Sequence, residues 1–212
     1  MLITQYYEEL SYRTEDDMNH TRFSLEQKLY AIKNAYYQVY SIVDDKHLSE
    51  FKLADQTVSI SEVDPTGRPY GIISSPYALR LMSAYDMTNN RQCKIVTKDE
   101  YDNSGPNYKY GTLVSLCDSH NALESTSSSY TNILYVSPST SSIFIKYIRS
   151  LAGENYDGNA LTDNIPVTET LSPVVLGIAE SELWKSDNAE GRAKSAYAEA
   201  INILTALEAQ WR

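Results

Sequence analysis

The chain has 212 residues, and 18 Lys and Arg against 28 Asp and Glu give a formal net charge of −10. This length suits one domain with room for an insertion. A content of 42% hydrophobic and 22% charged residues is typical of a globular protein and excludes a disordered or fibrous one. The acidic balance argues against a protein that grips nucleic acid or an anionic membrane, because both need clustered Lys and Arg.

The compartment is indicated by what the sequence lacks. Acidic residues near the start come before any apolar core of a secretory signal could form, so we expect no signal peptide. The longest uncharged stretch, residues 125–145, is rich in Ser and Thr and contains Pro138, which favours a turn and strands over a membrane helix. Cys93 and Cys117 are too few for a disulfide scaffold, so free thiols in a reducing compartment are expected.

Helices are predicted at the N-terminal end. Residues 2–12 form a weakly amphipathic segment, and an acid-rich connector follows. A second helix is predicted over residues 24–44, because apolar side chains recur there at alternating spacings of four and three residues. Ser24 with Gln27 three positions later forms a capping box at its start. The apolar stripe consists of Leu25, Leu29, Ile32, Tyr36, Val39 and Val43.

The middle of the chain, residues 51–150, reads as short strands separated by turns. Residues 56–63 alternate apolar and polar side chains, and the Asp-Pro-Thr-Gly sequence at 64–67 is typical of a turn. The runs 133–136 and 143–149, joined by a short connection of Ser, Thr and Pro, are the best candidate for a β-hairpin. Further short apolar runs are predicted strands at 70–73, 79–85, 93–97 and 112–116.

The C-terminal end is predicted to be helical again. Ser172 before Pro173 marks the start of one helix, since Pro is tolerated at the first helical position. Asp187 with Glu190 repeats the capping-box spacing at the start of a second helix. The very short turn between them predicts an antiparallel helical hairpin. The two predicted helices span about residues 173–185 and 188–211.

These elements predict an α+β fold. The first part is a bundle of N-terminal helices over residues 1–50. A central antiparallel block of short strands follows over 51–150, and a C-terminal antiparallel helical hairpin over 165–212 comes last. We expect one domain over residues 1–212.

Motifs of catalysis and of cofactor binding are absent from the sequence. It contains no G-x-G-x-x-G, P-loop, G-x-S-x-G or H-E-x-x-H pattern, and its histidines stand alone. Residues 157–163 superficially resemble a calcium loop but lack its Gly and its terminal acid. The acids of residues 99–102 could form a carboxylate pair, but we expect them to be solvated. We therefore expect no enzyme, no cofactor and no metal.

Three stretches, in chain order, resemble the head-to-tail connector (adaptor) proteins of tailed bacteriophages. The first is the N-terminal helix pair that ends in the apolar stripe. The second is the pair of strand sequences ILYVSP at 133–138 and IFIKYIR at 143–149. The third is Ile165-Pro166-Val167, a short helix that ends at Trp184, a polar turn around Asp187, and an Ala-rich closing helix. Residues 86–130 depart from the usual pattern of the family and resemble an insertion.

The resemblance implies a structural virion protein. Similar proteins form a ring, commonly of twelve copies, beneath the portal, and they continue the DNA channel toward the tail. The implied partners are the portal protein, tail or tail-hub proteins and further copies of the chain. The implied location is the neck of the virion after assembly in the host cytoplasm, without a membrane. DNA passes such a channel without specific binding, so we expect acidic side chains to line it, because they repel phosphates.

Candidate interface residues follow from the same resemblance and from the value of aromatic and Arg side chains as anchors. They are Trp211, Arg212, Tyr135 and Tyr147, with the alternative that Trp211 packs against the core of its own chain. The 18 Tyr residues against 3 Phe and 2 Trp lead us to expect many tyrosines at subunit contacts.

A second hypothesis comes from the same excess of tyrosine. The chain could be a glycan-binding or adhesin-like surface module that uses exposed tyrosines. The two hypotheses differ in where the tyrosines lie, because a glycan-binding module needs them in one open cleft, whereas a connector buries them between subunits.

Overall fold

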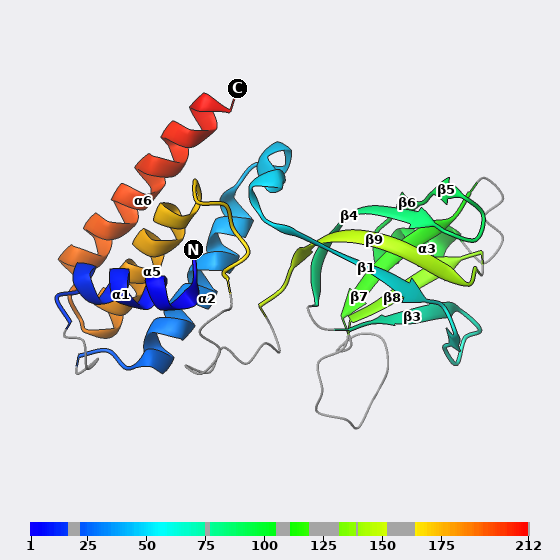
Figure 1. The fold of residues 1–212 in the computed structure, drawn as a ribbon, viewed down its shortest axis with the longest axis horizontal. Coiled ribbons are helices and arrows are strands. Elements are labelled where there is room, and N and C mark those ends of the chain that lie inside the picture. Colours follow the sequence, from blue (N-terminus) through cyan, green and yellow to red (C-terminus); the bar gives the residue numbers. More distant parts are fainter. Residues whose placement is uncertain are drawn as a thin grey trace. The chain divides into compact units, whose positions relative to one another are not determined.

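The computed structural model describes residues 1–16, 22–74, 77–104, 111–118, 132–138, 140–151 and 164–211. It has the α+β class predicted from the sequence (Figure 1). The chain divides into two compact units. The helical unit comprises Met1–Lys52 and Asn155–Arg212, and the strand unit is the continuous segment Leu53–Glu154. The strand unit begins and ends close to the 51–150 block expected within a single domain.

The helical unit is built from both ends of the chain around one central helix, α5. This helix is buried on nearly all sides and packs against α1, α2 and α6, as can be followed in Figure 1. Isolated β-bridges join Leu2 to Asn164 and Phe51 to Val167, so the two ends of the chain also meet through backbone pairing. The helices of the unit are α1 (Ile3–Arg13), α2 (Leu25–Ile42), the 3₁₀ helix η1 (Asp45–Glu50), α5 (Ser172–Ser186) and α6 (Glu190–Gln210).

The capping box at the start of α2 is confirmed. The Gln27 N–H donates to Ser24 Oγ at 3.2 Å, and the Ser24 N–H donates to Gln27 Oε1 at 2.8 Å. The apolar stripe is correct only in its C-terminal part, because Leu25 is 37% exposed while Lys28, one turn further on, is fully buried. A cation on the buried face is not visible in a hydrophobic pattern, and its partner comes from another element.

The C-terminal helices form the predicted antiparallel hairpin, but their predicted caps are wrong. The N-cap of α5 is Leu171, and the Ser172 hydroxyl instead donates to the Thr168 carbonyl and accepts a hydrogen bond from the Tyr6 hydroxyl at 3.0 Å. Asp187 is the C-cap of α5 and makes no cap for α6, whose N-cap is Ala189. Tertiary partners thus take the side chains that local spacing assigns to caps.

The strand unit contains two sheets with a shared apolar core. One sheet has the order β1-β9-β4-β5, and the other has the order β2-β3-β8-β7-β6. Core side chains come from both sheets, with Val58 and Ile145 in the first and Val114 and Leu134 in the second. The strands are β1 (Leu53–Ser59), β2 (Glu62–Val63), β3 (Pro69–Ile73), β4 (Ala78–Asp86), β5 (Arg91–Gln92), β6 (Lys94–Ile95), β7 (Leu113–Asp118), β8 (Asn132–Ser137) and β9 (Ser142–Arg149).

The predicted hairpin of residues 133–136 with 143–149 is wrong. In the structure, β8 lies between β3 and β7, whereas β9 lies between β1 and β4 in the other sheet. Both are interior strands of their sheets, and β8 is buried at every position. The short connection between them therefore passes from one sheet to the other, which proximity in sequence does not reveal.

Three further features refine the expected strand block. The turn at 64–67 is confirmed, with Gly67 at φ +84°, a left-handed conformation that glycine adopts without strain. Strands β6 and β7 run parallel, in contrast to the antiparallel pairing elsewhere. The described parts of the expected insertion at 86–130 supply β5, β6, β7 and a short helix, α3 (Lys98–Ser104), and so form part of both sheets rather than an excursion from them.

Candidate functional site

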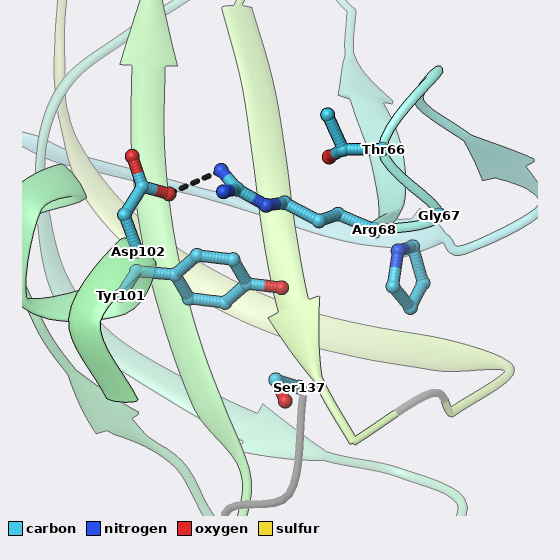
Figure 2. A pocket seen from close by; sticks show the side chains of 7 residues that line it. Thr66, Gly67, Arg68, Tyr101, Asp102 and Ser137 are labelled. Atoms are coloured by element: carbon cyan, nitrogen blue, oxygen red, sulfur yellow. Dashed lines mark hydrogen bonds and ion pairs between the residues drawn. The ribbon is translucent and has the colours of Figure 1, made fainter. Parts of the chain in front are cut away.

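A recess of about 270 Å³ lies beside the turn between β2 and β3 (Figure 2). Asp64 fixes the conformation of this turn, because its Oδ1 accepts hydrogen bonds from the N–H groups of Thr66 and Arg68, both at 2.9 Å. This turn, α3 and the end of β8 together supply the walls. The lining residues are Thr66, Gly67, Arg68, Pro69, Tyr101, Asp102 and Ser137.

The charges of the recess centre on one carboxylate. The Arg68 guanidinium is ion-paired with Asp102, as the dashed line in Figure 2 marks. Lys98 Nζ lies 2.6 Å from Asp102 Oδ1 and 4.8 Å from the ring centroid of Tyr135. Burial opposes the ionisation of the Asp64 carboxyl, but hydrogen bonds from the Arg68 and Thr66 backbones and the Thr66 hydroxyl outweigh it and lower its pKa.

The hydroxyl groups of the recess do not form a catalytic pair. Burial raises the pKa of Tyr101 to about 12, and its hydroxyl donates to the Val136 carbonyl at 2.8 Å. Ser137 Oγ is buried and makes no hydrogen bond within the described residues. A serine nucleophile needs a base within hydrogen-bond reach, and no described lining residue forms a hydrogen bond with Ser137 Oγ. The recess therefore offers polar groups for binding, without an activated nucleophile.

The recess also differs from a tyrosine-lined cleft. Tyr101 is the one tyrosine among the described residues that line it, and the hydroxyl of that residue is already bonded inside the unit. Where the structure describes the chain, six tyrosines are buried within the units: Tyr6, Tyr7, Tyr36, Tyr101, Tyr135 and Tyr147. The expectation that tyrosines lie at subunit contacts is therefore wrong for these six, which pack in the cores of their own chain.

A second polar cluster in the strand unit centres on Asp86, whose side chain is fully buried. Its carboxylate accepts hydrogen bonds from Thr112 Oγ1 at 2.6 Å, Thr140 Oγ1 at 2.8 Å and Asn89 Nδ2 at 2.8 Å. Burial alone would raise the pKa of Asp86, but these bonds outweigh it and hold the pKa well below its usual range. Thr112 precedes β7 and Thr140 precedes β9, so hydrogen bonds to this carboxylate hold both segments against the end of β4.

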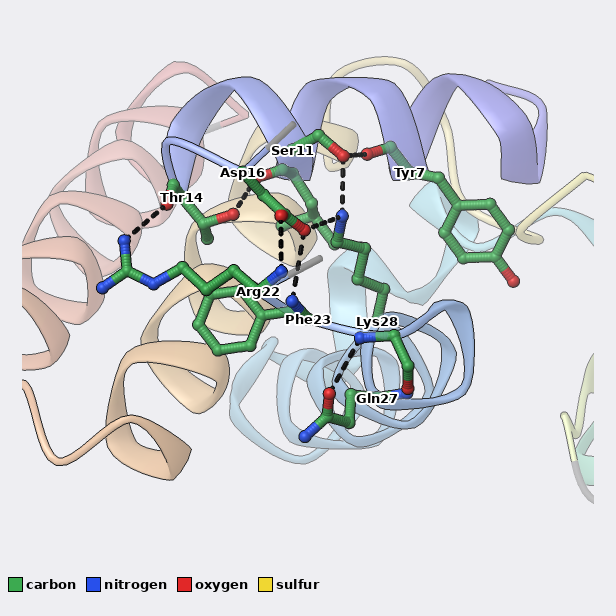
Figure 3. Close-up of polar contacts among 10 residues, drawn as sticks. Tyr7, Ser11, Thr14, Asp16, Arg22, Phe23, Gln27 and Lys28 are labelled. Atoms are coloured by element: carbon green, nitrogen blue, oxygen red, sulfur yellow. Dashed lines mark hydrogen bonds and ion pairs between the residues drawn. The ribbon is translucent and has the colours of Figure 1, made fainter. Parts of the chain in front are cut away.

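A buried ion pair lies in the helical unit (Figure 3). Lys28 Nζ donates to Asp16 Oδ2 and to Ser11 Oγ, both at 2.7 Å, and the side chains of Lys28 and Asp16 are fully buried. The Asp16 carboxylate also accepts from the N–H groups of Arg22 at 2.9 Å and Phe23 at 3.2 Å. The pair thereby fixes the start of α2 against the end of α1.

The residues proposed as a partner interface lie in different environments in the structure. Tyr135 and Tyr147 are 1% and 0% exposed, so the expectation that they contact a partner is wrong. Each lies on a core-facing position of an interior strand, which a short sequence motif does not indicate. Trp211 packs against His47, with ring centroids 4.6 Å apart and ring planes tilted by 45°, in agreement with the alternative that it packs against its own chain. Arg212 and the calcium-like residues 157–163 lie outside the described residues.

Sequence reasoning missed the two ion pairs described above. Arg68 and Asp102 are 34 positions apart, and Asp16 and Lys28 are 12 apart, so neither spacing corresponds to one turn of a helix. A signal for α3 was present, however. Thr97 and Glu100 form a capping box at its start, with the Thr97 N–H donating to Glu100 Oε2 at 3.0 Å and the Glu100 N–H donating to Thr97 Oγ1 at 3.2 Å.

Comparison with known proteins finds no family model that matches the chain and no curated protein that matches it significantly. Among the residues that the structure describes, no helix is long and apolar enough to cross a membrane. Within the same part of the chain, no three or more His, Cys, Asp or Glu side chains gather as a metal site would require.

Proposed function

We propose that the protein is a non-enzymatic structural subunit of a head-to-tail connector ring of a tailed bacteriophage. The observation that carries this proposal is the arrangement of the chain ends. The N-terminal helix pair and the C-terminal helical hairpin build one unit around α5, and the strand segment stands between them in sequence. This is the order of elements on which the resemblance to connector proteins rests.

Two properties of the surface support an assembly role. The recess beside the β2–β3 turn carries an ion pair and a bonded tyrosine rather than a nucleophile with its base. The net charge of −10 suits the wall of a channel through which DNA passes, since like charges repel the phosphates. In the connector proposal, the partners are the portal above the ring, tail proteins below it and further copies of the chain, with twelve as the expected number of copies.

Electron cryomicroscopy of the purified protein mixed with the portal of its phage tests the proposal. We expect a continuous ring of density beneath the portal, and native mass spectrometry of the complex then counts the copies. The portal alone is the control. A mixture in which the density is that of the portal alone at saturating protein would refute the connector role.

The same reconstruction tests the expectation for the channel. If the subunit continues the DNA channel, its acidic side chains should predominate along the inner wall of the ring. A ring with a neutral or basic inner wall would contradict this part of the proposal while leaving the ring itself in place.

A further inference from the structure

The strand unit has an open groove between β1 and β3. Strand β1 pairs with β9 on one side only, and the other side of β1 faces β3, which belongs to the second sheet. The groove between them has a volume of about 320 Å³. No backbone hydrogen bond joins β1 to β3 in the described part of the chain. The lining residues are Gln56, Thr57, Val58, Ser59, Ser61, Glu62, Ile72 and Ser74.

The ladder of hydrogen bonds shows which backbone groups of β1 face this groove. The Ile60 N–H donates to the Ser141 carbonyl at 3.0 Å, in the register of the β1–β9 pairing. Because backbone groups of an antiparallel strand point alternately to its two sides, Gln56 and Val58 face β9 as Ile60 does. The backbone N–H and C=O groups of Asp55 and Thr57 therefore face away from β9, toward the groove.

The opposite wall presents the same kind of unpaired edge. The Asp64 N–H donates to the Arg68 carbonyl at 3.0 Å in the β2–β3 ladder, so Tyr70 faces β2 and Ile72 faces the same side. Strand β2 is only two residues long and does not reach Ile72. The groove is narrow near Gly71, where a Cβ atom would lie 2.5 Å from the Ser59 carbonyl oxygen. The groove is thus closed at that end, and at Thr57 its wall is backbone for which no partner is found among the described residues.

Side chains in the groove lack partners as well. Gln56 Nε2 donates to Ser74 Oγ, but Gln56 Oε1 is buried without a hydrogen bond among the described residues. Ile72, near the end of β3, is 54% exposed. Asp55 and Glu62 are exposed and form no ion pair in the described part of the chain. The groove is therefore lined by the exposed apolar side chain of Ile72 and by the carboxylate of Glu62. Asp55 lies beside the groove, on β1 two positions before the lining residue Thr57.

Strand β6 lies at one edge of the sheet that also contains β3. Its exposed groups are complementary in charge and polarity to those of the groove. The N–H groups of Lys94 and Val96 donate to the Thr112 and Val114 carbonyls, at 2.8 and 3.0 Å, so the backbone of Ile95 faces away from β7. The side chains of Lys94 and Ile95 are exposed. This edge offers the outward-facing backbone of Ile95, the apolar side chain of the same residue and the cation Lys94. These match the backbone and Ile72 of the groove, the lining acid Glu62 and the neighbouring Asp55.

We propose that the β1–β3 groove of one copy of the chain receives the β6 edge of the next copy by strand addition. Main-chain hydrogen bonds to Asp55 and Thr57 supply affinity in such a contact, and Lys94 opposite Asp55 and Glu62 fixes its direction. The contact joins two different surfaces, so it is heterologous, and a heterologous contact that repeats with closure makes a ring. This inference rests on the connector role and identifies the surface by which neighbouring subunits meet.

Charge reversal with rescue tests the contact. We expect Asp55→Lys with Glu62→Lys to weaken assembly on the portal by about tenfold or more, because two attractive pairs become repulsive, and we expect Lys94→Glu to weaken it too. The chain that carries all three substitutions should recover most of the assembly. Native mass spectrometry and electron cryomicroscopy with the portal measure ring occupancy. The exposed α6 substitutions Glu199→Lys and Lys194→Glu are the matched controls and should assemble as the unmodified chain does.

Disulfide cross-linking tests the same contact without changing the charge of the chain. Thr57→Cys and Ile95→Cys in one chain should yield a ladder of disulfide-linked oligomers on the portal under oxidation, whereas either substitution alone should yield at most dimers. Assembly that is unaffected by charge reversal, together with no ladder, would overturn the proposed contact but leave the connector role. An unmodified chain that does not assemble on the portal at all would overturn both.

Discussion

Lys28 is a fully buried cation of the helical unit. A charged pair inside a protein stabilises it only when every charge finds its partners, since the cost of removing an ion from water is several kcal/mol. Lys28 meets this condition, with Asp16 and Ser11 both 2.7 Å from its ammonium nitrogen. Asp16 in turn receives two backbone N–H groups from the residues just before α2. The pair therefore stabilises the entry to α2, and neither residue can be replaced alone at low cost.

Lys28→Met should lower the free energy of unfolding by about 3–5 kcal/mol, because it leaves the Asp16 carboxylate buried without its cation. Lys46→Met is the matched control. The ion pair of Lys46 with Asp44, at 3.2 Å, is half exposed, and such pairs contribute about 1 kcal/mol or less. Urea unfolding monitored by circular dichroism measures both. Equal effects of the two substitutions would contradict the role assigned to Lys28.

The same carboxylate makes stability depend on pH. Burial opposes the ionisation of Asp16, but hydrogen bonds from Lys28 and from the Arg22 and Phe23 backbones outweigh it and lower its pKa. A carboxyl group with a lowered pKa contributes stability above its unfolded pKa of about 3.9, and this contribution is lost as the pH falls through the folded value. We therefore expect the unmodified protein to lose more stability between pH 5 and pH 3 than Lys28→Met does. Urea titrations at several pH values provide the comparison, and parallel pH curves would be inconsistent with it.

At the scale of helices and strands, the sequence predicts those features that depend on local periodicity, such as the positions of helices. The C-terminal part of the α2 stripe, the capping box at Ser24 and the position of the C-terminal hairpin agree with the structure, because each depends on residues within a few turns of one another. The partners of β8 and β9 could not be predicted in this way. Their pairing depends on which of the two sheets each strand joins, and a short apolar run in the sequence does not indicate its neighbouring strands.

The same limit applies to the candidate site. The turn at Asp64 was predictable, since Asp, Pro and Gly occupy typical turn positions. The recess beside it was not, because Arg68, Asp102 and Ser137 come from a turn, a helix and a strand end that meet only in the folded unit. Sequence spacing therefore locates the scaffold of this recess but not its chemistry.

Close approach of α5 and α6 yields a prediction at this scale. A Cβ atom on Gly177 would lie 2.9 Å from the Cβ of Ala200, which is closer than side-chain packing permits. Gly177→Ala should therefore destabilise the protein by about 1–3 kcal/mol through overpacking, although alanine normally favours a helix over glycine by up to about 1 kcal/mol. Thermal or urea unfolding measures the change.

Two variants make that prediction specific. Gly191→Ala, near the start of α6, has no atom within 4 Å of the new Cβ, so it should be neutral or stabilising. Combining Gly177→Ala with Ala200→Gly moves the methyl group across the interface and should restore part of the lost stability. A destabilisation as large in Gly191→Ala as in Gly177→Ala would show that helix packing is not the cause.

At the scale of the whole molecule, each unit closes its own core. The apolar clusters of the strand unit draw all their members from Leu53–Glu154. The helical unit instead depends on both chain ends, because α5 supplies the buried centre against which α1, α2 and α6 pack. A continuous unit with a complete core is the kind of segment that folds without the rest of its chain.

Residues 53–154 expressed alone should therefore give a folded protein with a cooperative unfolding transition and dispersed amide signals in NMR spectra. A chain that ends at residue 163 should retain this transition but lose the one that belongs to the helical unit, because α1 and α2 no longer have α5 to cover their apolar faces. The full chain, scanned by calorimetry under the same conditions, is the reference for both. An unfolded 53–154 segment, or a chain ending at 163 with full α1 and α2 helicity, would show that the cores are not closed in the way the contacts indicate.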